Sequence, residues 1–204
     1  MLDNIFEILF LAFFVAGCVI RAVCLFRVPH WWRDKKNIVD DREAALDKLL
    51  MFFQFLGMQV LPLIYVFSPW LNFSDYLLPT WAGLVAGWVG AAIFVAALWL
   101  LWRSHADLGH NFSPELKIKE EHSLVTRGIF SYIRHPMYAA HFLWAIAQAL
   151  LLQNWIAGLA FLVSFIPLYM LRVPREEQMM LEQFGDEYRE YIARTGRIIP
   201  FLRG

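Results

Sequence analysis

Five apolar stretches divide this chain, and they constrain its fold more than any other feature. They cover residues 5–25, 49–67, 80–102, 138–152 and 155–171. A helix needs roughly 20 apolar residues to cross the hydrocarbon core of a bilayer, where helices satisfy all of their backbone hydrogen bonds internally. Apolar residues make up 59% of the chain, against about half in a soluble domain. The sequence therefore predicts an all-α, polytopic membrane protein with five transmembrane helices in a single domain.

The last two predicted spans are close neighbours in the sequence. Only Gln153 and Asn154 separate them, so we expect the two helices to form a tight hairpin. Proline lies inside two of the spans, as Pro62 in the second and Pro167 in the fifth. Because proline lacks a backbone N–H and its ring clashes with the preceding turn, each is expected to kink its helix.

Lysine and arginine residues concentrate in alternate segments outside the spans. They occur in residues 27–48, in the loop 103–137 and in the tail 172–204, whereas residues 68–79 and the turn 153–154 contain none. Cytoplasmic loops carry an excess of these residues, so we expect the N-terminus outside and the C-terminus in the cytoplasm. The three basic segments, including helices in the tail, can then meet at one membrane face. The net charge is zero, which gives no indication of nucleic-acid binding, and the histidines lack the spacing of a metal site.

A polar stretch, residues 122–138, runs directly into the fourth span. Residues 126–128 are predicted to turn at Gly128, and residues 129–133 to form a short helix. Pro136 favours an extended conformation for His135 and begins a new helix. The start of that helix offers backbone N–H groups and positive potential, which suit a carboxylate. We expect this stretch to hold a charged cofactor at the membrane surface.

The tail brings a second polar group to the same face. Arg172 ends the fifth span, and Glu176 and Glu177 follow Pro174 at the expected start of another helix, where acidic residues suit the helix dipole. Gly185 is predicted to break this helix into two. An apolar stripe with helical spacing, predicted to pack on the membrane or over the site, consists of Met180, Phe184, Tyr188 and Tyr191.

Taken together, the two polar blocks resemble a known family. The first block reads His122-x-Leu124-Val125-x-x-Gly128-x-Phe130-x-x-x-Arg134-His135-Pro136-x-Tyr138. The second reads Arg172, Glu176-Glu177-x-x-x-Leu181-x-x-Phe184-Gly185-x-x-Tyr188-x-x-Tyr191. In order and spacing they are similar to the isoprenylcysteine carboxyl methyltransferase family, and most similar to its short prokaryotic members with five spans. The resemblance covers about residues 45–200.

The resemblance implies S-adenosylmethionine as the methyl donor and the C-terminal carboxylate of a prenylated cysteine as the acceptor, giving a methyl ester. The cofactor would lie on the cytoplasmic side under the tail, and the lipid would enter from the bilayer. Carried over by motif, the cofactor site consists of His122, Leu124, Val125, Gly128, His135, Pro136, Tyr138 and Glu177. Arg172 and Glu176 are the candidate catalytic residues beside the acceptor, with Arg175 and Glu177 as the alternatives for that contact.

The chemistry of the residues agrees with this reaction. A carboxylate acceptor is already ionised at neutral pH, so catalysis needs alignment and no strong base. Three other functions are compatible with the same pattern. They are methyl transfer to another lipid or small molecule, such as a phospholipid amine or a thiol; a membrane sterol reductase that uses NADPH; and a non-catalytic five-helix membrane protein.

Overall fold

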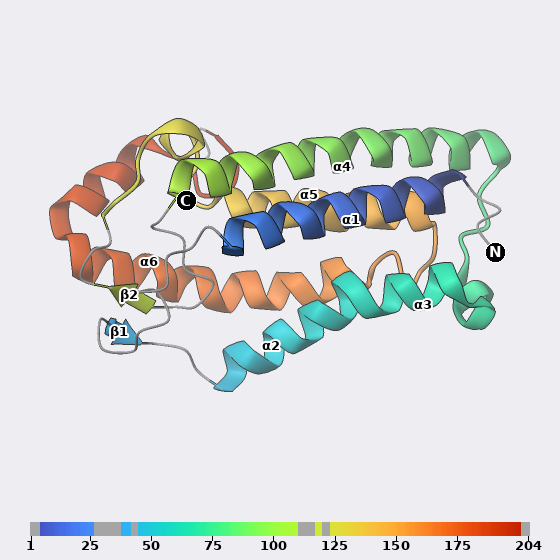
Figure 1. The fold of residues 1–204 in the computed structure, drawn as a ribbon, viewed down its shortest axis with the longest axis horizontal. Coiled ribbons are helices and arrows are strands. Elements are labelled where there is room, and N and C mark those ends of the chain that lie inside the picture. The colour runs from blue at the N-terminus through green and yellow to red at the C-terminus, as the bar shows by residue number, and fades with distance from the viewer. Residues whose placement is uncertain (1–4, 27–37, 42–44, 110–116, 120–122, 201–204) are drawn as a thin grey trace.

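A computed structural model of the chain describes residues 5–26, 38–41, 45–109, 117–119 and 123–200. The protein is built from helices that run along one long axis (Figure 1). The main helices are α1 (Ile5–Phe26), α2 (Ala45–Phe55), α3 (Leu61–Phe67), α4 (Thr80–Leu108), α5 (Pro136–Leu152) and α6 (Ala160–Arg194). Helix α4 packs on α5 and α1, and α2 packs on α6. The predicted all-helical membrane fold is confirmed, with one small sheet added.

The helices differ in how well they fit a bilayer. Three segments are long and apolar enough to cross it, namely Ile5–Cys24, Ala45–Phe67 and Thr80–Leu108, and Pro136–Leu152 is a shorter apolar helix. Their outward faces carry large exposed hydrophobic side chains, among them Phe53, Trp88 and Val95, which lipid would cover. The protein is therefore a multi-pass membrane protein.

The second predicted span begins earlier than expected and contains a π-helical turn. Between α2 and α3 lies η3 (Leu56–Val60), just before Pro62. Because the proline ring clashes with the carbonyl four residues back and removes one hydrogen bond, the widened turn accommodates it. Nε2 of Gln148 donates hydrogen bonds to the Gly57 carbonyl at 3.0 Å and to the Ala157 carbonyl at 2.7 Å. The predicted irregularity is real, and α5 supports it.

The predicted start of the fifth span at Trp155 is wrong. Helix α5 ends at Leu152, Gln153 has a left-handed conformation with φ 48°, and the chain turns until α6 begins at Ala160. The cause is Asn154, which is fully buried and accepts hydrogen bonds from the backbone N–H groups of Ile156 and Ala157. An asparagine that caps its own turn in this way competes with helix formation.

Helix α6 corrects the prediction for the tail. It passes through Pro167 and Pro174 without ending, so no new helix starts before Glu176 and Glu177. Helix α6 stays intact because Leu168 (3% exposed), Val173 (1%) and Glu177 (7%) pack into the protein on both sides of Pro174. The two glutamates lie in mid-helix, and the helix dipole does not explain them. The predicted break at Gly185 is confirmed by its non-helical φ of 54° and ψ of −123°.

The polar segments gather at one end of the molecule (Figure 1). Strand β1 (Ile38–Asp41) pairs in antiparallel orientation with β2 (Lys117–Lys119), which brings the first two predicted cytoplasmic segments together. The short 3-10 helix η6 (Gly128–Ser131) and the second half of α6 lie at the same end. The opposite end holds the start of α1 and the 3-10 helix η4 (Pro69–Ser74). This arrangement places the predicted site residues near one another.

Candidate active site

The turn before α5 matches the sequence prediction at Gly128, but His135 is not extended as Pro136 predicted. Gly128 has a positive φ of 61°, and η6 follows it with Phe130 buried. His135 has φ −122° and ψ 60°, and Pro136 opens α5 in the first turn. Arg134 and His135 are therefore presented from a rigid turn at the end of the helical bundle, and both are buried.

The chain returns to this turn after α6 ends. Residue Gly196 pairs with Ile133 as an isolated parallel bridge. The backbone N–H of Arg134 donates to the Gly196 carbonyl at 2.8 Å, and that of His135 donates to the Arg197 carbonyl at 2.9 Å. The N–H of His135 is therefore already used, which removes one of the donors that the sequence suggested for a ligand carboxylate.

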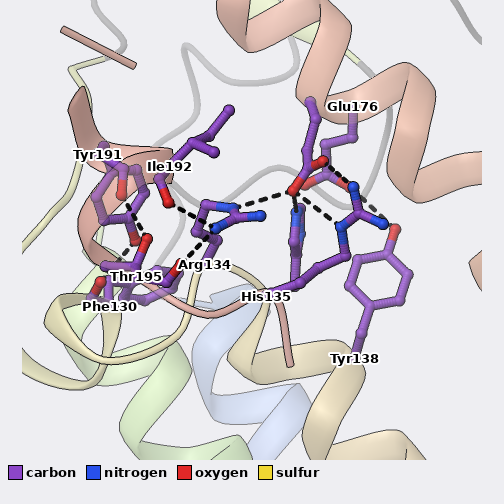
Figure 2. A network of polar contacts seen from close by, with 10 residues as sticks. Phe130, Arg134, His135, Tyr138, Glu176, Tyr191, Ile192 and Thr195 are labelled. Carbon is purple, nitrogen blue, oxygen red and sulfur yellow. Dashed lines mark hydrogen bonds and ion pairs between the residues drawn. The ribbon is translucent and has the colours of Figure 1, made fainter. Parts of the chain in front are cut away.

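Arg134 binds carbonyl groups at the C-terminal end of α6. Its Nη1 donates to the Thr195 carbonyl at 2.6 Å and to the Ile192 carbonyl at 3.3 Å. Tyr191 fixes the same region, because its hydroxyl donates to the Phe130 carbonyl at 2.6 Å. A cation at a helix C-terminus is stabilised by the exposed carbonyl groups. The turn and the tail thus form one structural unit (Figure 2).

Glu177 is the centre of this unit. Its Oε1 accepts from Nε of Arg134 at 3.0 Å, from Nε2 of His135 at 3.2 Å and from Nε of Arg197 at 3.2 Å. Its Oε2 accepts from Nη2 of Arg197 at 2.6 Å. We call these four residues, Arg134, His135, Glu177 and Arg197, the Glu177 cluster.

The electrostatics of the Glu177 cluster keep its carboxylate charged. Burial raises the pKa of Glu177, but the hydrogen bonds from His135, Arg197 and Arg134 outweigh that effect and lower the pKa to about 2. Two arginines face one carboxylate, so the cluster has a net positive charge. Nη2 of Arg134 is buried and has no hydrogen-bond partner among the described residues. The cluster can therefore hold a polar ligand that carries an acceptor group.

A second carboxylate lies one residue away and faces a different partner. The hydroxyl of Tyr138 donates to Oε2 of Glu176 at 2.9 Å (Figure 2). Arg172, one helical turn before Glu176, is 9% exposed and contacts the sulfur of Met51 on α2. Arg175 points instead toward the fully buried Asp47, with Nη1 3.1 Å from Oδ2. Of the two arginines, Arg172 is the one on the side of Tyr138 and Glu176.

The remaining predicted cofactor residues are less closely connected to the cluster. His122 lies outside the described residues, and Leu124 and Val125 are half-buried in the segment before η6. Gly128 lines a separate groove of about 660 Å³ at the end of α4, together with Trp99, Trp102, Arg103, Ile129, Ser131 and Tyr132. Pro136 is buried at the start of α5. The structure thus brings together His135, Tyr138, Glu176 and Glu177 from the predicted set.

Two members of the Glu177 cluster were not predicted as site residues. Arg134 stands next to His135 in the first motif, and its position before Pro136 was the signal that it shares the turn. Arg197 was only one of several basic residues in the tail. No local pattern relates it to Glu177, which is 20 residues away in the sequence.

The comparisons with known proteins agree with the resemblance seen in the sequence. Residues 89–182 match the sequence model of the isoprenylcysteine carboxyl methyltransferase family. The chain is 40% identical over 96 residues to protein-S-isoprenylcysteine O-methyltransferase of Saccharomyces cerevisiae, covering 46% of this chain and 40% of that protein. It is 34% identical over 96 residues to protein-S-isoprenylcysteine O-methyltransferase B of Arabidopsis thaliana, covering 46% and 49%.

The chain thus spans about half the length, or less, of these curated relatives. Among solved structures, it is similar to the eukaryotic intramembrane Ras methyltransferase, an isoprenylcysteine carboxyl methyltransferase. The TM-score is 0.51 at 23% identity, covering 81% of this chain and 56% of that one. This likeness supports the fold, and the segment 89–182 that matches the family model includes the predicted catalytic pair and all of the predicted cofactor residues.

Proposed function

We propose that this chain, which belongs to the isoprenylcysteine carboxyl methyltransferase family over residues 89–182, methylates the C-terminal carboxylate of a prenylated cysteine with S-adenosylmethionine as donor. The observation that carries the proposal is the pair of carboxylates on one turn of α6. Glu177 is held by three basic side chains, and Glu176 is held by Tyr138 beside Arg172. Both lie at the polar end of an otherwise apolar bundle.

The donor half of the site is formed by the Glu177 cluster and the turn before α5. His122, Leu124, Val125, Gly128, His135, Pro136, Tyr138 and Glu177 are the residues assigned to it. When bound, S-adenosylmethionine supplies an electrophilic methyl group on a sulfonium. The net positive charge of the Glu177 cluster and the buried Nη2 of Arg134 suit an anionic acceptor group. These features fit the carboxylate of S-adenosylmethionine.

The acceptor half is formed by Arg172 and Glu176. Arg172 holds the substrate carboxylate with two parallel N–H groups, as guanidinium groups do. Glu176 is held in place by the Tyr138 hydroxyl. With S-adenosylmethionine held by the donor half, Arg172 and Glu176 would direct one oxygen of the substrate carboxylate toward the methyl group that the cofactor would supply. Since no proton moves, the residues act by alignment.

The membrane supplies the route for the lipid substrate. We infer five spans, with α5 and the first part of α6 as the last two, connected as a hairpin through residues 153–159. The N-terminus lies outside, and the end with the Glu177 cluster lies in the cytoplasm, in line with the distribution of Lys and Arg. A prenyl chain then enters the apolar space between helices from the bilayer, while its carboxylate reaches Arg172.

Two measurements test this function. Membranes that contain the protein should transfer labelled methyl groups to N-acetyl-farnesylcysteine, and Arg172→Gln should reduce the transfer at least 10-fold, because one charge-assisted pair is lost. The purified protein should also bind S-adenosylhomocysteine in calorimetry, and His135→Ala should weaken that binding. Label that appears on ethanolamine lipids or on a thiol instead would show a different acceptor. No binding at all would refute a methyltransferase.

A further inference from the structure

The C-terminal segment after α6 contains a cation whose contacts reach both parts of the donor site. The backbone carbonyl of Arg197 accepts the N–H of His135 at 2.9 Å. Its side chain donates to both oxygens of Glu177, from Nε at 3.2 Å and from Nη2 at 2.6 Å. Arg197 lies outside the segment 89–182 that matches the family model and is not a residue of either motif.

The two oxygens of Glu177 depend on Arg197 to different degrees. Oε1 is shared by Arg134, His135 and Arg197, so loss of one donor leaves two. For Oε2, the hydrogen bond from Arg197 is the one seen among the described residues. A guanidinium that binds both oxygens fixes the plane of a carboxylate, which a single donor leaves able to rotate. Arg197 therefore sets the orientation of Glu177.

The exposure of the three basic residues also separates Arg197 from the others. The Arg134 side chain is 1% exposed and that of His135 is 5% exposed, whereas that of Arg197 is 34% exposed. Arg134 also binds the carbonyl groups of Ile192 and Thr195, so it has a structural role in closing α6. The Arg197 side chain contacts Glu177 and lies within hydrogen-bonding reach of Tyr169. Its main function is consequently directed at Glu177.

We propose that Arg197 is a positioning residue of the donor site, which orients the Glu177 carboxylate for the cofactor and so sets the affinity for S-adenosylmethionine. The inference rests on the proposed function, because it takes Glu177 as a cofactor contact. It adds the C-terminal segment to the site, beyond the two motifs. Arg197 acts through Glu177 and is not expected to touch the transferred methyl group.

Calorimetric binding of S-adenosylhomocysteine to the purified full chain tests the role. Arg197→Gln should weaken binding roughly 10-fold to 100-fold, which corresponds to the loss of hydrogen bonds to a charged group. Arg197→Lys should recover part of the affinity, since it keeps the charge but not the two parallel donors. Arg194→Gln is the matched control. It removes an exposed arginine at the end of α6, which lies over the Tyr191 ring, and should bind as the wild type does.

Kinetics and a double variant separate positioning from a general effect on folding. Arg197→Gln should raise the KM for the donor and leave the KM for the acceptor unchanged. In a Glu177→Gln background, Arg197→Gln should cause almost no further loss, because its target is gone. If Arg197→Gln is too unstable to purify, Arg197→Lys alone must still show the donor-specific rise in KM.

The outcomes distinguish this inference from the proposed function. Wild-type protein that binds the ligand while Arg197→Gln binds it equally well would overturn the role of Arg197 alone. An equal loss in Arg194→Gln, or losses that add in the double variant, would also overturn it. Wild-type protein that fails to bind would refute the methyltransferase itself. Wild-type protein that binds the ligand but methylates a different acceptor would change the proposed substrate and would leave the positioning role of Arg197 unaffected.

Discussion

Glu177→Gln is the substitution that tests the structural account of the site most directly. Glutamine keeps the shape of the side chain but removes the charge that compensates Arg134 and Arg197. The Arg134 side chain is 1% exposed, so its charge would remain buried with only carbonyl partners. Removing one member of a buried ion pair costs about 3–5 kcal/mol in other proteins. We expect a loss of the same order here.

The pKa of Glu177 gives a second measure of this loss. Folding lowers the pKa from 4.5 to about 2, and about 1.36 kcal/mol per pH unit converts this to about 3 kcal/mol of stability at pH 7. Because the folded pKa is depressed, the contribution is complete well above pH 4.5 and is lost as the pH falls toward 2. At pH 3.5, about 1 kcal/mol of it should already be gone.

The assay is reversible unfolding in mixed detergent micelles at pH 7 and pH 3.5, for the wild type and Glu177→Gln. The difference in the free energy of unfolding should be about 3 kcal/mol at pH 7 and about 1 kcal/mol smaller at pH 3.5. Glu187→Gln, which changes an exposed glutamate of the same helix, is the control and should change little at either pH. A difference that is independent of pH, or below about 1 kcal/mol at pH 7, would refute the reasoning.

Three further substitutions probe other contacts, each by the same unfolding measurement. Arg175→Gln should lower the free energy of unfolding by about 2 kcal/mol, since it removes the cation that pairs with the fully buried Asp47. Adding Asp47→Asn to the same chain should recover part of this loss. Losses that simply add in the double variant would contradict the pairing. Gly185→Ala should lower the free energy of unfolding by about 1–2 kcal/mol, because the φ of 54° at this position is strained for any residue with a Cβ atom. An unchanged stability would mean that the backbone at residue 185 can adopt an unstrained conformation. Asn154→Ala should cost about 3 kcal/mol, because it removes bonds to the Leu71 carbonyl and Asp75 as well as the turn contacts; a loss below 1 kcal/mol would contradict its role.

The two adjacent glutamates show how α6 divides the site. The Glu177 side chain points toward the turn before α5 and the C-terminal segment, and the Glu176 side chain points toward Tyr138. Consecutive positions on a helix point about 100° apart, so one turn of helix serves two separate environments. Because α6 is continuous through Pro174, both glutamates lie in mid-helix and their directions follow from helical geometry.

The sequence by itself determined the features that depend on local chemistry. Runs of apolar residues predicted the membrane helices, and the glycine in the turn before α5 predicted the turn at Gly128. The same holds for the helix break at Gly185. Steric limits on φ and ψ and the length of an apolar run act within a few residues, so a single stretch of sequence contains the information.

Tertiary structure alone decided which polar groups meet. Glu177 binds Arg134, 43 residues earlier, and Arg197, 20 residues later, and Arg175 binds Asp47 across 128 residues. The continuation of α6 through Pro174 and the late start of α6 after Asn154 were decided in the same way, by burial of Val173 and by the bonds of a fully buried asparagine. A buried charge or amide must find a partner wherever packing places one, and packing depends on the whole chain.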